Sequence, residues 1–478
     1  MRAVFDVLNP ATGDRVAQVP KASAQEALAA VETARLAQVD WRRRGGHGRA
    51  EVLRRWFDLV TAKTEELARL MVLEQGKPLA EARGEIAYAA SFIRFYAEEA
   101  SRLHGETIPS SSPDRRQLVV REPVGVCAAI TPWNFPAAMV TRKVAPALAA
   151  GNTMVLKPSE FTPLTALRLA ELATEAGLPV GVLNVVVGDA VEIGAVLTSS
   201  PTVRMLSFTG STPVGRLLMA QCAPTVKKLG LELGGNAPFI VFDDADLDAA
   251  VDGAIASKYR NAGQTCVCAN RFFVQRGVYE DFAARLIERV RSLRTGNGLE
   301  EGVTQGPLIN EAARRKALSH VTDALARGAR LGIGGGAVDG PGWFMQPTVL
   351  LDVTAGMRCL DEETFGPVAP LVAFDTEAEA IAWANASEFG LASYFYSRDV
   401  ARCFRVAEAI ESGMVGINTG AISSETVPFG GIKQSGLGRE GSRHGLDEYT
   451  ELKLMSFGGI GTSSPSGAIG AIGAAGVG

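Results

Sequence analysis

Histidine and cysteine are both scarce in this chain of 478 residues, which contains four histidines and six cysteines. His47, His104, His320 and His444 show no metal-ligand spacing, which argues against both a metal site and a Ser-His-Asp triad. Six irregularly spaced cysteines are too few for a disulfide framework and suit a reducing compartment. Basic residues are not in excess either, because 48 lysines and arginines face 52 aspartates and glutamates. The resulting net charge of −4 does not indicate nucleic acid as the main ligand.

Long apolar segments are absent as well. The first ten residues, MRAVFDVLNP, contain no apolar segment of the kind found in signal peptides. No uninterrupted apolar run approaches the ~20 residues needed to span a bilayer. Hydrophobic residues make up 47% of the chain and charged residues 21%, which is typical of globular proteins. We therefore expect a soluble, cytoplasmic protein with a large core and about three lobes, two or four also being compatible with this length.

The order of apolar segments predicts an α/β fold. Residues 24–38, 49–75 and about 79–103 carry apolar residues at three- and four-residue spacing, as amphipathic helices do. From residue 125 onward, short apolar strands alternate with helices, which is typical of a parallel sheet covered on both faces. Ligands bind such sheets at the carboxyl ends of the strands. The strands predicted in this region are 125–131, 153–159, 183–188 and 203–211.

A second α/β segment begins near Pro238 and continues to about residue 430. Within it, Gly332 to Ala337 matches the G-x-G-x-x-A dinucleotide pattern by letters, but Asp339-Gly-Pro follows and no helix can begin there. We interpret this glycine run as a loop. The last twenty residues, 459–478, are rich in Gly, Ala and Ser, and we expect them to be mobile. The strands predicted in the second segment are 271–275, 347–353 and 368–374.

One cysteine lies in a setting that suits a nucleophile. The stretch Asn261-Ala-Gly-Gln-Thr-Cys266-Val-Cys268 places Cys266 just after a glycine turn, next to exposed backbone N–H groups. Taken alone, the stretch equally describes a buried, inert cysteine, because most free cysteines are core residues. Three other segments favour the catalytic interpretation.

Each of these segments presents one polar group among small or apolar residues. In Leu231-Glu232-Leu-Gly-Gly, burial would raise the pKa of the carboxyl and make Glu232 a usable general base, although an ion-paired strand residue would read the same. Asn134 lies between two prolines and suits an oxyanion donor or a turn cap. In the Phe208–Gly215 stretch, a strand leads through Gly210 and Ser211 into a helix N-terminus. Such a connection can bind a phosphate, but it can also be a simple tight turn.

Together these segments resemble the aldehyde dehydrogenase superfamily, in its order and at its spacing, over the whole chain except the tail. The resemblance implies a Rossmann-type cofactor domain, an α/β catalytic domain and a small β oligomerisation arm. The implied ranges are 1–107 with 123–233 for the dinucleotide-binding domain, 234–430 for the catalytic domain, and 108–122 with 446–458 for the arm. The matching segments are Trp133-Asn134, Lys157-Pro-Ser-Glu160, Phe208-Thr-Gly-Ser211, Glu232-Leu-Gly-Gly, Gly263-Gln-Thr-Cys266 and Glu363-Thr-Phe365-Gly-Pro.

The resemblance also implies a reaction, the NAD(P)-dependent oxidation of an aldehyde to a carboxylic acid. Cys266 would attack the aldehyde carbonyl, and the Asn134 amide with the Cys266 N–H would hold the oxyanion. A hydride would leave for the nicotinamide, and Glu232 would activate the water that releases the acid from the thioester. These roles suit a soft nucleophile, a neutral donor and a base.

The same resemblance implies the cofactor residues. Lys157, Ser159 and Glu160 would lie at the adenosine ribose. A carboxylate accepts hydrogen bonds from a free 2′-hydroxyl and repels a 2′-phosphate, so Glu160 favours NAD, although NADP stays possible because Lys157 offers a positive charge. The residues implied elsewhere along the cofactor are Thr131, Trp133, Gly210, Ser211, Glu363 and Phe365.

Three further residues concern the substrate. Arg142, Arg260 and Ser423, with the Cys-Val-Cys sequence, resemble the succinate-semialdehyde dehydrogenase branch, in which they would bind a distal carboxylate. Either arginine would otherwise form a structural ion pair. Glutarate semialdehyde or a broader range of aldehydes stays open, because one methylene is worth only about 1–3 kcal/mol of discrimination.

Other interpretations remain at this stage. Cys268 suits a packing cysteine better than a redox disulfide partner of Cys266, because a disulfide requires narrow geometry. A thiol-dependent acyl transferase or esterase on the same scaffold would use Cys266 and Glu232 without hydride transfer. A CoA-acylating enzyme would have little use for Glu232. The exposed strand edges implied for the arm predict a homodimer or a homotetramer.

Overall fold

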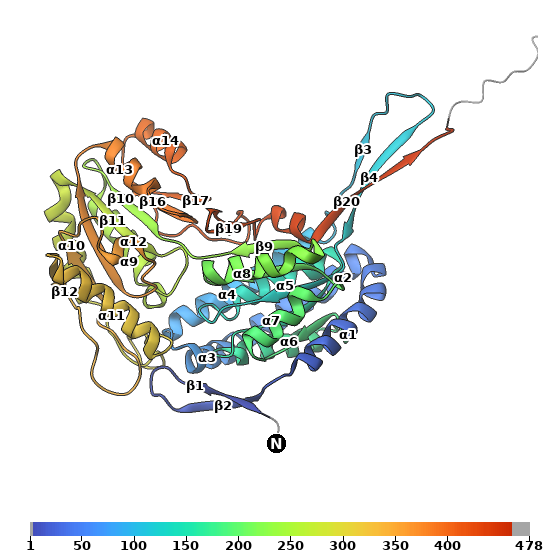
Figure 1. Cartoon of the computed structure of the whole chain (residues 1–478), viewed down its shortest axis with the longest axis horizontal. Coiled ribbons are helices and arrows are strands. Elements are labelled where there is room, and N and C mark those ends of the chain that lie inside the picture. The colour runs from blue at the N-terminus through green and yellow to red at the C-terminus, as the bar shows by residue number, and fades with distance from the viewer. Residues whose placement is uncertain (1–2, 461–478) are drawn as a thin grey trace, which may run out of the picture.

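The computed structural model describes residues 3–460, so the tail predicted at 459–478 lies almost entirely outside the described residues. Two lobes, each built on a mostly parallel sheet, lie side by side, and a β arm projects from the first (Figure 1). A two-stranded hairpin of β1 (Val4–Leu8) and β2 (Arg15–Pro20) precedes the first helix. Within the described part of the chain, no helix is both long enough and apolar enough to cross a membrane.

The first lobe contains a six-stranded sheet in the order β19-β9-β8-β5-β6-β7. All neighbours are parallel except the short β19, which runs antiparallel to β9 and arrives from the far end of the sequence. The strands predicted near residues 125, 153, 183 and 203 are therefore confirmed. Their bounds are β5 Val126–Ile130, β6 Thr153–Lys157, β7 Leu183–Val185, β8 Val203–Thr209, β9 Lys228–Glu232 and β19 Gly436–Leu437.

Helices cover both faces of this sheet, as the unbroken apolar character of its strands predicts. Along β5, Cys127 and Ala129 pack into the cluster formed with α2, α4, α5 and α6, whereas Val126 and Ala128 face α1, α7 and α8. The predicted helical stretch 49–75 is two helices that meet at Lys63. The bounds are α1 Ala24–Arg43, α2 Gly45–Ala62, α3 Thr64–Gln75, α4 Leu79–Glu99, α5 Ala138–Ala150, α6 Pro163–Glu175, α7 Ala190–Ser199, α8 Thr212–Cys222 and the short η1 Ala223–Thr225.

The second lobe contains a seven-stranded sheet in the order β12-β13-β14-β11-β10-β16-β17. Only β12, at one edge, is antiparallel to its neighbour. The three predicted strands are confirmed, but the loop interpretation is wrong for Gly332 and Ile333, which end β12 because its pairing with β13 continues to Ile333. The bounds are β10 Ala237–Val241, β11 Ala269–Gln275, β12 Arg330–Ile333, β13 Thr348–Leu351, β14 Val368–Phe374, β16 Ala392–Tyr396 and β17 Met414–Ile417.

This second sheet is also buried on both faces. Phe239 and Phe272 pack towards α9 and α10, whereas Ile240 and Phe273 pack towards α11, α13 and α14. A two-stranded sheet of β15 and β18 lies near the lobe junction. The bounds are α9 Leu247–Lys258, η2 Arg260–Gly263, η3 Arg276–Val278, α10 Tyr279–Arg291, α11 Glu311–Ala326, α12 Arg358–Asp361, α13 Glu377–Asn385, α14 Val400–Ala409, β15 Phe389–Gly390 and β18 Ile432–Lys433.

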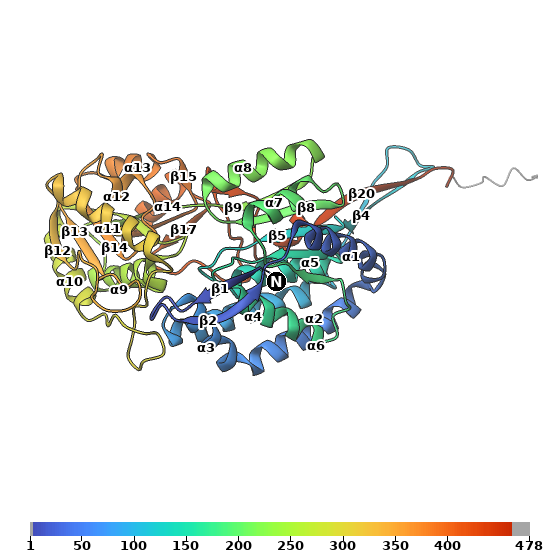
Figure 2. The ribbon, with the colours of Figure 1, turned by 60° about the horizontal axis from the view of Figure 1, so that its bottom comes forward.

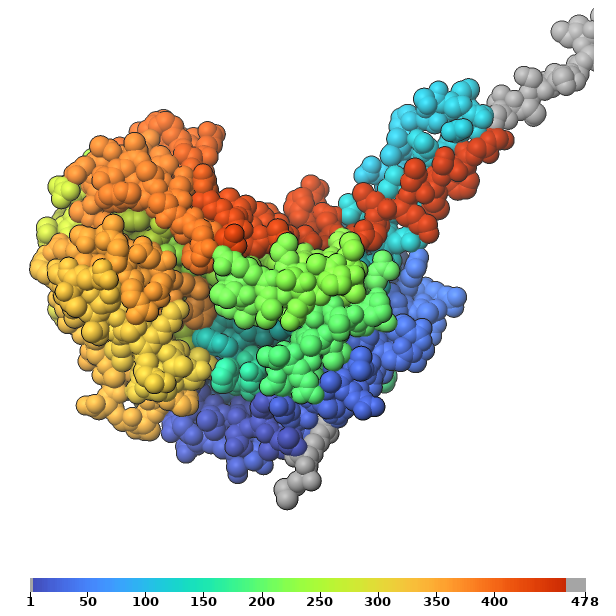
Figure 3. All heavy atoms as spheres, viewed as in Figure 1, coloured from blue at the N-terminus to red at the C-terminus, as the bar shows by residue number. Residues whose placement is uncertain are grey.

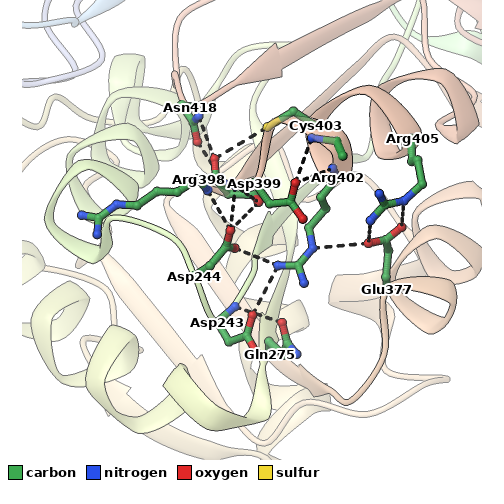
Figure 4. Close-up of polar contacts among 12 residues, drawn as sticks. Asp243, Asp244, Gln275, Glu377, Arg398, Asp399, Arg402, Cys403, Arg405 and Asn418 are labelled. Carbon is green, nitrogen blue, oxygen red and sulfur yellow. Dashed lines mark hydrogen bonds and ion pairs between the residues drawn. The ribbon is translucent and has the colours of Figure 1, made fainter.

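A charged network fastens the outer helices to the second sheet (Figure 4). The Asp244 carboxylate, in the loop after β10, accepts hydrogen bonds from the backbone N–H groups of Arg398 and Asp399 at the start of α14. It also accepts from the Arg402 guanidinium at 2.8 Å, and Arg402 in turn reaches Glu377 on α13 at 3.3 Å. These contacts lie away from the lobe junction and hold α13 and α14 to the second sheet.

The arm is a three-stranded antiparallel sheet in the order β20-β4-β3. It stands clear of both lobes, as Figures 2 and 3 show. Leu452 and Leu454 of β20 are 63% and 58% exposed, so the arm presents apolar side chains that nothing in the described chain covers. The first residues of the predicted segment 446–458 belong to the 3₁₀ turn η4 instead. The bounds are β3 Glu106–Ile108, β4 Arg116–Pro123, η4 Arg443–Tyr449 and β20 Thr450–Phe457.

Candidate active site

Two cavities meet at Cys266, at the junction of the lobes. The first, of about 330 Å³, is called here the arginine-lined cavity, and the second, of about 280 Å³, the glycine-lined cavity. Cys266 and Met139 line both. The arginine-lined cavity is further defined by Tyr88, Phe135, Arg142, Arg260, Ser423 and Phe429, and the glycine-lined cavity by Trp133, Asn134, Thr209, Gly210, Ser211, Gly234, Glu363 and Phe365.

A constrained turn holds Cys266 at this junction. Asn261 and Ala262 adopt left-handed backbone angles, with φ of 52° and 53°, and Gly263 follows at +75°. A side chain at Gly263 would lie 2.2 Å from the Gly366 carbonyl oxygen, so only glycine fits. Left-handed non-glycine residues are costly and cluster at functional sites, because the surrounding structure must impose them.

Burial has the largest effect on the pKa of the Cys266 thiol. It raises the pKa of the Cys266 thiol to about 12, and the positive charge of Arg142 is the largest effect in the opposite direction. The thiolate is the nucleophilic form, so the resting site holds its nucleophile protonated. Cys266 is nevertheless partly exposed to the two cavities, which distinguishes it from the fully buried Cys268.

The Glu232 carboxyl ends strand β9 and is 3% exposed. Among residues 3–460, neither of its oxygens has a hydrogen-bond partner and no cation pairs with it. Burial raises its pKa well above the usual range, the Glu440 carboxylate raises it further, and Arg142 and Lys143 oppose both effects. The alternative interpretation of Glu232 as an ion-paired strand residue is therefore wrong. The group is a buried, weakly acidic carboxyl, which is the property a general base needs near neutral pH.

The Asn134 side chain is fixed beside the cysteine turn. Its amide nitrogen donates to the Gln264 carbonyl oxygen at 3.0 Å, which leaves one of its two N–H groups for another acceptor. Its backbone oxygen accepts from Lys77 Nζ at 2.9 Å and from Asn261 Nδ2 at 3.0 Å. This network makes Asn134 a rigid donor and not a turn cap.

The glycine-lined cavity has features that fit the nicotinamide and pyrophosphate end of a dinucleotide. A side chain at Gly210 would lie 2.3 Å from the Phe208 ring, and one at Gly234 would lie 3.1 Å from the Glu363 carboxylate. The buried Thr209 hydroxyl lacks a hydrogen-bond partner in the described part of the chain. The helix α8 begins just after Ser211, whose side chain does not cap it, so the helix start suits a phosphate, although Pro213 contributes no N–H to it.

Two further residues define the wall of this cavity. Burial raises the pKa of Glu363 to about 7, although its carboxylate accepts a hydrogen bond from the Gly235 N–H at 3.1 Å. The rings of Trp133 and Phe365 meet edge to face with centroids 5.6 Å apart. These residues fit a nicotinamide dinucleotide.

The residues expected at the adenosine ribose lie outside both cavities. Lys157, at the end of β6, forms an ion pair with Glu160, with the Nζ and Oε2 atoms 2.8 Å apart. The Ser159 hydroxyl accepts from the Phe161 N–H at 3.2 Å. The Thr131 side chain is buried and lines neither cavity. The Lys157 charge is thus already neutralised by Glu160.

The three residues expected to bind a distal carboxylate do converge. Arg142, Arg260 and Ser423 all line the arginine-lined cavity with Cys266. Arg142 forms an ion pair with Glu440 at 2.8 Å, yet its Nε atom has no partner within the residues that the structure describes. The Arg260 guanidinium lies over the Phe135 ring, 5.2 Å from its centre, and pairs with no carboxylate in residues 3–460. The ion-pair interpretation therefore holds for Arg142 only in part and fails for Arg260.

Several charged groups around these arginines escaped the sequence analysis. Glu440 pairs with both Arg142 and Lys143, and Lys77 pairs with Glu85 at 2.5 Å. The sequence could have indicated Glu85, because Glu81, Glu85 and Tyr88 fall on one face of a predicted helix. Nothing in the sequence indicates that Glu440 reaches α5, since the two segments are about 300 residues apart.

Cys268 lies in the core next to the active turn. Its Sγ atom is 3.4 Å from the Lys258 carbonyl oxygen, and the cysteine is free. These contacts support the packing interpretation over the redox one.

The comparisons with known proteins agree with this geometry. The sequence model of the aldehyde dehydrogenase family matches residues 2–455. The chain belongs to that family. It is 60% identical over 454 residues to the succinate-semialdehyde dehydrogenase (NADP(+)) GabD of Escherichia coli, covering 95% of this chain and 94% of that protein. It is equally 60% identical over 454 residues to a glutarate-semialdehyde dehydrogenase of Pseudomonas aeruginosa, with the same coverage.

A solved structure gives the same result. The crystal structure of succinate-semialdehyde dehydrogenase from Burkholderia pseudomallei matches with a TM-score of 0.95 and 61% identity, over 95% of each chain. The predicted aldehyde dehydrogenase fold is therefore confirmed, and the chain is an NAD(P)-dependent oxidoreductase of that family.

Replacing the fixed amide tests the oxyanion role. Asn134→Ala should lower kcat about 10²–10³-fold while changing KM little, because the lost donor acts on charge that develops in the transition state. Steady-state kinetics measure the effect, and Asn184→Ala, which removes a loop-holding amide far from both cavities, serves as control. A kcat within threefold of the wild type would contradict the assignment.

Proposed function

We propose that the chain oxidises a short aldehyde that carries a distal carboxylate, with succinate semialdehyde as the favoured substrate. The observation that carries the proposal is the convergence of Arg142, Arg260 and Ser423 on the cavity that ends at Cys266. Arginine offers a carboxylate a planar fork, and serine adds one hydrogen bond. Glutarate semialdehyde, one methylene longer, is the alternative, followed by a broad range of aldehydes.

In this proposal each residue at the junction has one task. The Cys266 thiol would lose its proton to solvent water, and the thiolate would attack the aldehyde carbon to form a thiohemiacetal, whose oxyanion accepts from the Asn134 amide and the Cys266 N–H. A dinucleotide, when bound, would supply the acceptor for the hydride that leaves this carbon, so that the carbon becomes the carbonyl of a thioester. Glu232 then takes a proton from the water that cleaves the thioester, and the acid leaves. Because the pKa of Glu232 is raised, the rate of this last step rises with pH through that pKa.

The dinucleotide has its residues in this scheme as well. Gly210, Ser211 and the start of α8 hold the pyrophosphate, and Glu363 with Phe365 and Trp133 holds the nicotinamide riboside. Lys157, Ser159 and Glu160 hold the adenosine ribose, with Thr131 close to the loop that carries Trp133. A thiol-dependent transferase or esterase has no use for this second cavity at its nucleophile, which favours the dehydrogenase.

We also propose the division of the chain into a dinucleotide-binding domain, 1–107 with 123–233, and a catalytic domain, 234–430. The arm, 108–122 with 446–458, serves oligomerisation, since its exposed apolar strand needs a cover. A homodimer or homotetramer provides it.

Removing the unpaired arginine tests the substrate class. Arg260→Ala should lower kcat/KM for succinate semialdehyde about 10- to 100-fold, mostly through KM, because the distal carboxylate loses a charged hydrogen bond. Propanal, which has no carboxylate, should be affected less than threefold. Arg285→Ala, which breaks only exposed ion pairs with Asp248 and Asp281, is the matched control. Equal losses for both aldehydes would discard the carboxylate role.

The cofactor preference depends on Glu160. We propose that NAD is preferred over NADP, because Glu160 repels a 2′-phosphate and already occupies Lys157. The expected ratio of kcat/KM values is about tenfold or more, since two like charges about 4 Å apart in water repel by ~1 kcal/mol and the phosphate carries nearly two charges. Glu160→Gln should raise kcat/KM with NADP, whereas Glu171→Gln, on the outside of α6, should not. A wild-type preference for NADP would refute the argument.

A further inference from the structure

The Tyr88 hydroxyl, beside the arginine-lined cavity, has no role in the proposed reaction. Tyr88, on α4, lines this cavity together with Arg142, Arg260 and Ser423. Its phenolic oxygen is buried and has no partner in full hydrogen-bond geometry among residues 3–460, although the Ser423 hydroxyl is near enough to act on the Tyr88 pKa as a hydrogen-bonding neighbour. An unpaired buried hydroxyl costs free energy, so a native site that keeps one usually has a partner for it at some stage of its work.

Neighbouring side chains fix the position of the Tyr88 ring. The Tyr88 ring packs edge to face on Phe92, with centroids 4.9 Å apart, and Phe92 is fully buried. The Arg142 guanidinium lies 5.8 Å from the centre of the same Phe92 ring. Ser423 is close enough to affect the ionisation of Tyr88. The phenol therefore belongs to the same end of the cavity as the arginine and the serine.

The ionisation of Tyr88 keeps it a donor. Burial raises the pKa of the Tyr88 phenol, and the opposing charges of Arg142 and Arg260 do not cancel that effect. At neutral pH the group is a neutral O–H, which can donate to an anion without adding a charge to the cavity.

Several donors at this cavity could serve one carboxylate, whose two oxygens accept about four hydrogen bonds. The lining residues Arg142, Arg260 and Ser423 carry such donors, and Tyr88 adds a neutral O–H. Lys77 does not compete, because it is already bound to Glu85 and to the Asn134 carbonyl oxygen.

We infer that the Tyr88 hydroxyl is a further substrate-binding group, which donates a hydrogen bond to the distal carboxylate held by Arg142 and Arg260. The inference rests on the proposed function, because it requires a substrate with that carboxylate. It makes Tyr88 a determinant of specificity for aldehyde acids over neutral aldehydes.

Tyr88→Phe removes the oxygen and keeps the ring that packs on Phe92. We expect kcat/KM for succinate semialdehyde to fall about 10- to 100-fold, mostly through KM, as for a lost hydrogen bond to a charged group. For propanal we expect less than a threefold change. The melting temperature of the free protein should be unchanged or higher, because the variant buries no unpaired hydroxyl. A merely structural role would not give this combination.

Tyr96→Phe is the matched control on the same helix. The Tyr96 hydroxyl donates to the Ser442 carbonyl oxygen at 3.1 Å and lines neither cavity. Its loss should lower the melting temperature and leave the ratio of the two kcat/KM values as in the wild type.

The outcomes separate the two proposals. If the wild type prefers succinate semialdehyde to propanal and Tyr88→Phe keeps that preference, the role of Tyr88 is overturned and the proposed function stands. Equal losses for both aldehydes overturn it in the same way. If the wild type shows no preference for the aldehyde acid, the proposed function fails and the inference fails with it.

Discussion

The burial of ionisable groups at the lobe junction determines their pKa values, and the chemistry of the site depends on those values. Burial raises the pKa of Cys266 to about 12, that of Glu363 to about 7 and that of Glu232 well above its usual range. A site with only these groups would hold them all protonated. Arg142 and Lys143 oppose the effect on Glu232, and Arg142 opposes it on Cys266. One cation, Arg142, therefore acts on both Cys266 and Glu232.

Glu440 forms ion pairs with the two buried cations, Arg142 and Lys143. Burial would raise its own pKa, but Lys143 and Arg142 outweigh burial and hold the Glu440 pKa below its usual range. The ionised Glu440 partly compensates the two cations and adds to the upward shift of Glu232. Arg142 thus takes part in an ion pair, acts on the two proposed catalytic groups and lines the arginine-lined cavity. A substitution at Arg142 would disturb all three, which is why Arg260 and Tyr88 are better probes of substrate binding.

The sequence predicts the sheets and the chemistry-bearing segments well, for a physical reason. Parallel strands buried on both faces need continuous apolar runs, and glycines are required wherever backbones approach closely, as at Gly210, so both leave local signals. Glu232 was recognised because a lone carboxyl stands among apolar residues and glycines. The edge strand β12 was not predicted, because it is short and its last two residues belong to a glycine run that was interpreted as a loop.

The contacts between distant segments could not be predicted. The Arg142–Glu440 ion pair joins residues about 300 positions apart, and the closeness of Gly235 to the Cys266 carbonyl oxygen depends on the pairing of β10 with β11. Tyr88 illustrates the same limit, since its helix was predicted but not the cavity that its hydroxyl meets.

The central claim is that Cys266 takes up the acyl group and that the buried Glu232 is needed only to release it. Its most direct test is the rapid mixing of Glu232→Gln with succinate semialdehyde and NAD, followed by intact-protein mass spectrometry. The account predicts a burst of NADH equal to the number of active sites, no further turnover, and a succinyl group on Cys266. Steady turnover at the wild-type rate, or the absence of both burst and adduct, would contradict it.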